Sequence, residues 1–180
     1  MSSSYLNWLS PTAILFALSG CSAPAGQWTT VPAADNGGFT IMFPVEGGLQ
    51  DGSLQLGQET IPSHVNIVAD SGITYVSGWF TLTENMLRIP KDHLLDSIWQ
   101  IMPAQGAARP TDGPEILSSS DSDTRNGWFM SGDSVRLGVV LHKWNDRISI
   151  LSVGTPESNF GAGEHRNMVR YLRSFKLDSR

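Results

Sequence analysis

The sequence predicts a single α+β domain in which a mostly antiparallel sheet is flanked by helices. Three observations lead to this prediction: strand-like runs dominate, the order along the chain is strands, helix, strands, helix, and most links are of hairpin length. Because short links join antiparallel neighbours, helices are expected to pack on a mostly antiparallel sheet. The chain has 180 residues, and we place one domain at residues 28–180.

Three strand-like runs occupy the first half of this domain. Residues 38–44 are apolar and rich in β-formers, and residues 60–69 carry apolar side chains on one parity. The sequence Asp-Ser-Gly at residues 70–72 predicts a turn. Residues 73–82 carry bulky side chains on both parities, which is typical of a strand whose sheet is covered on both faces.

The second half begins with a helix and ends with a helix. Apolar residues at helical spacing predict a first helix that starts near Pro90 and is ended by Pro103 and Gly106. Further strands are expected at residues 115–121, 127–130, 135–141 and 147–153, with loops at 107–114 and 154–163. The sequence Asn-Asp at residues 145–146 predicts a tight turn, and residues 164–175 predict the closing helix.

Residues 1–20 have the pattern of an export signal peptide. They contain no charged residue, and their apolar stretch covers only residues 12–18. A membrane span needs about 20 apolar residues, so this stretch is too short to span a bilayer and is typical of the core of a signal. Residues 1–5 lack the Lys or Arg that usually begins such a signal.

The four residues after this stretch are an aliphatic residue, two small residues and a cysteine. They are Leu18, Ser19, Gly20 and Cys21, and Cys21 is the only cysteine in the chain. This pattern resembles the bacterial lipobox, which implies that the chain is held to membrane lipid through an acylated Cys21. The alternative is an unprocessed N-terminus with an unreactive cysteine. Residues 21–27 are interpreted as the lipidated cysteine and a short tether. By the same resemblance, Ser22 favours the outer membrane, facing the periplasm, in a cell with two membranes.

Three segments of the domain share letters with a group of bacterial proteins. They are GFTIMFP at residues 38–44, NDRISI at 145–150 and RSFKL at 173–177. These segments resemble the PsbP-like group, which includes small lipoproteins of the DcrB type. The resemblance implies an α/β/α sandwich with a central antiparallel sheet. It also implies a non-catalytic role, because members of the group mostly act as binding or assembly factors.

Composition and motifs exclude several functional classes. The net charge of −5 disfavours a nucleic-acid partner, since such partners require a basic surface. No phosphate-binding loop and no zinc signature are present, so neither a cofactor nor a metal is expected. His64 and His142 fall on predicted strands and would approach one another if those strands paired. Two histidines alone leave a metal under-ligated.

Tryptophans near the ends and turns of predicted elements are candidates for a docking patch. They are Trp28, Trp128 and Trp144, and Trp144, beside a predicted hairpin tip, is the strongest of them. The alternative is ordinary packing at the rim of the domain. Trp79 and Trp99 fall on core-facing positions instead.

Taken together, these patterns predict a lipid-anchored protein of the cell envelope that acts as a binding or assembly module near the membrane. Its expected partners are membrane lipid through Cys21 and an envelope protein or small ligand. Two alternatives stay open. One is an envelope hydrolase with an unfamiliar site built around His64 and His142, and the other is a structural subunit of an envelope complex.

Overall fold

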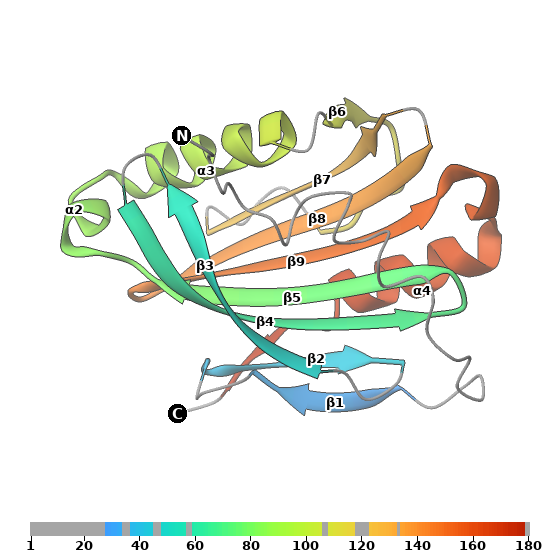
Figure 1. Cartoon of the computed structure of the whole chain (residues 1–180), viewed down its shortest axis with the longest axis horizontal. Coiled ribbons are helices and arrows are strands. Elements are labelled where there is room, and N and C mark those ends of the chain that lie inside the picture. Colours follow the sequence, from blue (N-terminus) through green and yellow to red (C-terminus); the bar gives the residue numbers. More distant parts are fainter. Residues whose placement is uncertain are drawn as a thin grey trace.

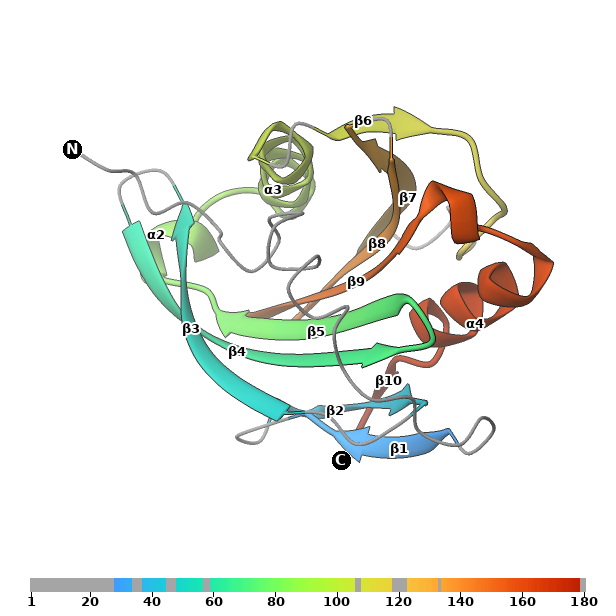
Figure 2. The same cartoon turned by 45° about the vertical axis from the view of Figure 1, so that its right-hand side comes forward.

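A curved antiparallel sheet forms the centre of the fold, with one helix on its concave face and another on its convex face (Figure 1, Figure 2). The computed structural model describes residues 28–33, 37–44, 48–56, 59–105, 108–117, 123–132 and 134–178. In these residues, seven antiparallel strands form the large sheet, in the order β3-β4-β5-β9-β8-β7-β6. They are β3 (Gly48–Leu56), β4 (Glu59–Asp70), β5 (Ile73–Thr81), β9 (Arg147–Pro156), β8 (Val135–Trp144), β7 (Thr124–Ser131) and β6 (Ala108–Thr111). The protein is therefore an α+β protein.

Side chains that alternate along the strands divide the interior into two cores. On β5, Phe80 belongs to the core under helix α3 (Lys91–Gln105), whereas Tyr75 belongs to the core under helix α4 (Ala162–Leu172). All of β5 except Thr81 is buried. The bulky residues on both parities of this strand thus predict its two-sided cover correctly.

Helix α3 packs on the concave face through a single apolar stripe. Leu94, Leu95 and Ile98 are buried in the core that it shares with the sheet. A short helix, α2 (Glu84–Leu87), precedes it and is capped by Thr83, whose hydroxyl accepts a hydrogen bond from the Met86 N–H at 3.4 Å. Helix α3 passes through Pro103, because a missing proline N–H removes only one main-chain hydrogen bond, and ends at Gln105, the residue before Gly106.

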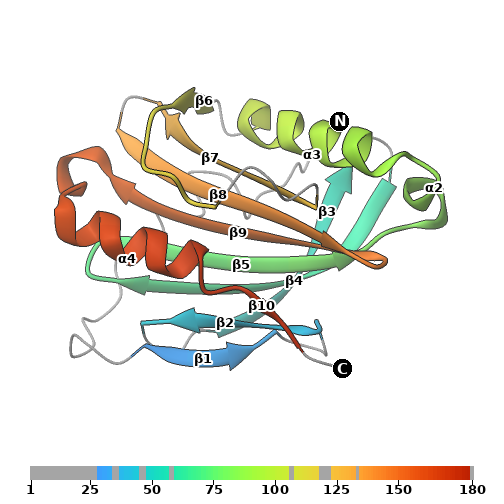
Figure 3. The ribbon, with the colours of Figure 1, turned by 180° about the vertical axis from the view of Figure 1, so that it is seen from behind.

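A second, smaller sheet lies beside α4 on the convex face (Figure 3). Its order is β1-β2-β10, with β1 (Thr29–Pro32), β2 (Phe39–Phe43) and β10 (Lys176–Leu177) all antiparallel. Ile41 and Phe43 of β2 are buried in the same core as α4. Ser174, between α4 and β10, fastens the two elements, since its hydroxyl accepts from the Met42 N–H at 3.0 Å and donates to the Tyr171 carbonyl at 2.7 Å.

The two expected helices and most of the expected strands are confirmed, but several regions differ from the predictions. Strands β1, β3 and β10 and helix α2 have no counterpart among them, β6 forms inside the expected loop at 107–114, and β9 continues into the expected loop at 154–163. Where a strand is expected at 115–121, residues 115–117 are irregular and the rest lies outside the described residues. Strand β6 lacks an alternating apolar pattern and is defined by pairing with β7, which a local pattern does not reveal.

Replacing Leu95 by alanine is expected to destabilise the fold by about 2–5 kcal/mol, because it leaves a cavity at a side chain with no exposed surface. The measurement is the free energy of unfolding from urea titration. The exposed Gln100→Ala change on the same helix is the control and should stay within about 0.5 kcal/mol of wild type. Equal effects at both positions would contradict the packing of this stripe.

Candidate functional site

The structure separates the residues that the sequence singles out. Leu18, Ser19, Gly20 and Cys21 lie outside the described residues. The three tryptophans of the expected docking patch do not come together, since Trp28 precedes β1, Trp128 lies within β7 and Trp144 ends β8. Each therefore has to be judged by its own surroundings.

Trp128 is buried and takes no part in a docking surface. Only 5% of it is exposed, and its indole N–H donates to the Pro114 carbonyl at 2.7 Å. The sequence predicts a position near a turn, but β7 continues three residues beyond Trp128, to Ser131. The Trp128 side chain lies in the core under α4. The expectation of a rim position is corrected here, because strand length is set by pairing with β8.

Trp28 is half-buried and fixes the point at which the chain enters the domain. Its ring meets Tyr75 edge-on, with ring centroids 5.8 Å apart. The guanidinium of Arg170 lies 4.7 Å from the centre of its ring, within the range of a cation–π contact. These contacts hold the start of β1 against α4, and they give Trp28 a packing role.

Trp144 stands at the end of β8 beside a group of aromatic side chains. Its ring lies edge-on to Phe39 at 5.5 Å and to Phe175 at 5.7 Å. Asn145 follows in the hairpin turn and adopts a φ of 49°, a left-handed conformation that Asn tolerates better than most residues. The side chain of Trp144 is therefore held at the seam between the β8–β9 hairpin and the small sheet, and it remains partly exposed.

Two hollows share a wall formed by Trp144, Asn145 and Leu177. The first has a volume of about 450 Å³ and the second about 500 Å³. The remaining lining of the first is Gly38, Asp146, Arg147 and Asp178, and that of the second is Asp123, Thr124, His142, Lys143 and Phe175. Leu177 is 52% exposed, which is high for a leucine next to aromatic rings. The shared wall thus presents apolar surface between two open spaces of ligand-pocket size.

Stacked rings and a polar contact form the inner wall of the second hollow. His142 stacks on Phe175 with ring centroids 4.0 Å apart and an interplanar angle of 11°. Its Nδ1 lies 3.2 Å from the hydroxyl of Thr124. Thr124 is only 6% exposed, so this hydroxyl–imidazole pair is packed in the wall and does not offer a nucleophile to a solute. Thr124 and His142 therefore form part of a surface that can bind a solute, not a catalytic pair.

His64 and His142 do not form a joint site. Strand β4 carries His64 and β8 carries His142, but β5 and β9 lie between these two strands in the sheet. The strand pairing that would bring the two histidines together is therefore not present. His64 stacks on Trp79, with ring centroids 4.6 Å apart. Because two other strands separate the histidines, the geometry gives no support to a catalytic pair.

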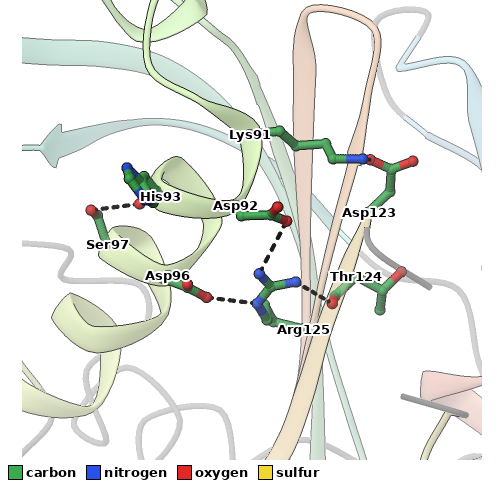
Figure 4. A network of polar contacts seen from close by, with 8 residues as sticks. All are labelled: Lys91, Asp92, His93, Asp96, Ser97, Asp123, Thr124 and Arg125. Atoms are coloured by element: carbon green, nitrogen blue, oxygen red, sulfur yellow. Dashed lines mark hydrogen bonds and ion pairs between the residues drawn. The ribbon is translucent and has the colours of Figure 1, made fainter. Parts of the chain in front are cut away.

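A network of polar contacts joins helix α3 to β7 (Figure 4), and its Asp123 also lines the second hollow. Arg125 donates to the Asp96 carboxylate at 2.7 Å and lies 3.5 Å from that of Asp92. Lys91 pairs with Asp123 at 2.7 Å. The aspartates raise the pKa of Arg125, so the guanidinium stays charged. These pairs orient the start of α3, and their opposite charges satisfy one another.

Another ion pair holds the segment that follows β6. Arg136 donates two hydrogen bonds to the Glu157 carboxylate, at 2.8 and 2.9 Å, and a third to the Asp112 carbonyl at 2.9 Å. This two-point pairing lowers the pKa of Glu157. Arg173 adds hydrogen bonds to the carbonyls of Ile116 and Glu115 at 2.6 and 2.7 Å. Side chains thus fix residues 112–117, which explains why they follow one path without forming a strand.

Clusters of metal-ligating side chains and buried phenols are the other groups of chemical interest in the described residues. Within the described residues, no three His, Cys, Asp or Glu side chains are grouped closely enough to hold a metal ion. Burial raises the pKa of Tyr75 and of Tyr171, so both phenols stay protonated at neutral pH. The shared wall and its two hollows are accordingly the best candidate site, and binding is the chemistry that they fit.

Comparisons with known proteins add no assignment to this geometry. No protein-family model matches the chain, and a search of curated proteins gives no match. Among the helices of the described residues, none has the length and apolar character needed to cross a membrane.

The Arg136–Glu157 pair is expected to make stability depend on pH in the acidic range. A lowered carboxylate pKa stabilises the fold where the group is ionised, so this contribution is lost as pH falls below the ordinary value of 4.5. At pH 7, Glu157→Gln should lower the free energy of unfolding by less than about 1 kcal/mol, because the pair is partly exposed. The difference from wild type should shrink below pH 4.5, and a difference independent of pH would refute this account. The exposed Glu115→Gln change is the control.

Proposed function

We propose that this protein is a lipid-anchored component of the bacterial cell envelope whose domain binds a protein or small ligand at the two hollows beside Trp144. The observation that carries the binding role is the wall of Trp144, Asn145 and Leu177 between hollows of about 450 and 500 Å³. The anchor rests on the lipobox-like residues that end at Cys21. In a cell with two membranes, we place the protein on the outer membrane, facing the periplasm.

The anchor that we propose consists of acyl chains attached to Cys21. Acyl chains contribute about 0.8 kcal/mol for each buried CH₂ group, and two or more chains hold a protein stably at a bilayer. Residues 22–27 would then tether the domain within about 20 Å of the membrane, at about 3.5 Å for each extended residue. A domain held this close acts near the membrane surface.

The register of the small sheet separates the tether from the hollows. Thr29, which follows Trp28, pairs with Phe43 at one end of β2, whereas Leu177 pairs with Phe39 at the other. Four residues of strand span about 14 Å, at about 3.4 Å each. A membrane-held tether therefore leaves the hollows at the far end of the small sheet, where a partner in the aqueous phase can reach them.

We also propose that the domain is PsbP-like. One helix on each face of a central antiparallel sheet supports this assignment, as do the three short sequence segments on which the resemblance rests. A non-catalytic role agrees with the separation of His64 from His142 by two strands. The hydrolase alternative has no observation in its favour.

Cys21→Ser is expected to abolish lipid attachment, since serine lacks the thiol that forms the thioether. The measurement is incorporation of labelled palmitate in cells that express the chain, followed by separation of membrane and aqueous fractions. The label should disappear, and the protein should leave the membrane fraction or accumulate as precursor. Labelling that persists in Cys21→Ser would exclude this site of lipidation.

A photo-crosslinking residue at Asn145 is expected to give a discrete covalent adduct in intact cells. Asn145 is exposed and lines both hollows, so a partner bound there lies within reach of the probe. Mass spectrometry identifies the adduct, and native gels show whether it is part of a larger envelope complex. The matched control carries the probe at Asn167, which is exposed on α4 away from both hollows.

The Trp144→Ala change decides between specific docking and chance proximity. If the hollows hold a partner, this change should reduce the Asn145 adduct at least several-fold, because it removes the shared aromatic wall. An adduct of equal yield with and without Trp144, or equal yields from Asn145 and Asn167, would overturn the binding role at this site. Urea titration confirms that the variant is folded.

A further inference from the structure

The last strand of the small sheet has an open edge beside the two hollows. Strand β10 pairs with β2 on one side, and no described strand pairs with it on the other. The Asp178 N–H donates to the Gly38 carbonyl at 3.0 Å, so Asp178 and Gly38 form a hydrogen-bonded pair. Because such pairs alternate along an antiparallel ladder, the N–H and C=O of Leu177 point away from β2, to the open edge. The Ala33 N–H bond to the Phe39 carbonyl, at 2.8 Å, agrees with this alternation.

The Leu177 side chain lines both hollows, so the open edge of β10 lies next to them. Directly paired residues of antiparallel strands lie on the same face, so Leu177 lies on the face of its partner Phe39. Phe39 packs against Trp144 and Phe175. A strand added to β10 would therefore place alternate side chains on this face, next to Leu177 and within reach of both hollows.

The charges around the first hollow favour a basic side chain in the added strand. Asp146 and Asp178 are both exposed and line this hollow together with the indole of Trp144. Arg147 lies 3.9 Å from Asp146, while its guanidinium is over the ring of Trp79 at 4.8 Å. Carboxylates beside an aromatic ring suit a Lys or Arg side chain, and they disfavour an anionic lipid headgroup.

We propose that β10 accepts an extended polypeptide segment as an additional strand, with an apolar and a basic side chain entering the two hollows. Main-chain hydrogen bonds with Leu177 supply directional affinity, and the hollows supply the choice of side chains. The inference rests on the proposed function, because it names the partner class for the same site. The proposed function requires only the wall of Trp144, Asn145 and Leu177, whereas strand addition also requires the open edge of β10.

The test selects binders of the purified domain, residues 21–180 with Cys21 replaced by serine, from a displayed library of random twelve-residue peptides. Selected peptides should combine a Lys or Arg with an aliphatic or aromatic residue two positions away, since alternate residues share a face. Hydrogen exchange followed by NMR then locates the peptide. The Leu177 amide should exchange at least tenfold more slowly in the complex, because it gains a partner. A library that yields no binder overturns the inference.

Variants separate the roles of main chain and charge. Leu177→Pro removes the outward N–H and should weaken binding about five- to tenfold, while Lys176→Ala, on the opposite face, should leave it unchanged. Asp146→Asn with Asp178→Asn should weaken binding several-fold at low salt and less at high salt. The paired control is Asp112→Asn with Glu115→Gln, two exposed carboxylates away from the hollows. Equal effects of the two double variants would overturn the charge argument.

The outcomes distinguish this inference from the proposed function. Peptides that perturb the Trp144 indole without protecting the Leu177 amide would refute strand addition and leave binding at the hollows intact. Protection that appears along β3, the edge strand of the large sheet, would refute the site in β10. Loss of the Asn145 crosslink is a separate measurement and bears on the proposed function alone.

Discussion

The central strands are buried on both faces, and this burial governs how the other elements are arranged. Every residue of β9 from Ile148 to Thr155 is buried, and β5 is buried up to Phe80. Apolar surface on both faces of these strands must be removed from water, because that transfer drives folding. Helix α3 covers the concave face, and α4 covers part of the convex face. The small sheet supplies the remaining cover through β2, whose Ile41 and Phe43 join the core under α4.

The small sheet, which completes the cover of the convex face, also forms part of the candidate site. Strand β10 reaches β2 because α4 ends at Leu172 and Ser174 then fastens the chain to both Tyr171 and Met42. This path brings Phe175 against the ring of His142. The β8–β9 hairpin ends beside it, with Trp144 packed edge-on to Phe175. The two hollows lie along this seam, with Trp144 and Leu177 in the lining of both.

Ionic contacts in this protein position elements and do not create reactive groups. Arg125 with Asp92 and Asp96 orients α3, while Arg136 with Glu157 holds the connection to the segment at residues 112–117. In both cases opposite charges stabilise each other's ionised forms. The candidate site is a different kind of surface, because it offers shape, an aromatic ring and a strand edge.

Apolar periodicity is a local property of the chain, and it predicts the order of most elements and the two-sided burial of the central sheet. It also placed Trp144 beside the hairpin turn, and the structure puts it in the wall of the hollows. Long-range pairing, by contrast, buries Trp128, separates His64 from His142 by two strands, and sets Leu177 beside both hollows. Strand order and burial depend on pairing between segments more than a hundred residues apart, as in β2 and β10. No local pattern encodes which strands meet, and therefore none reveals a site built where they meet.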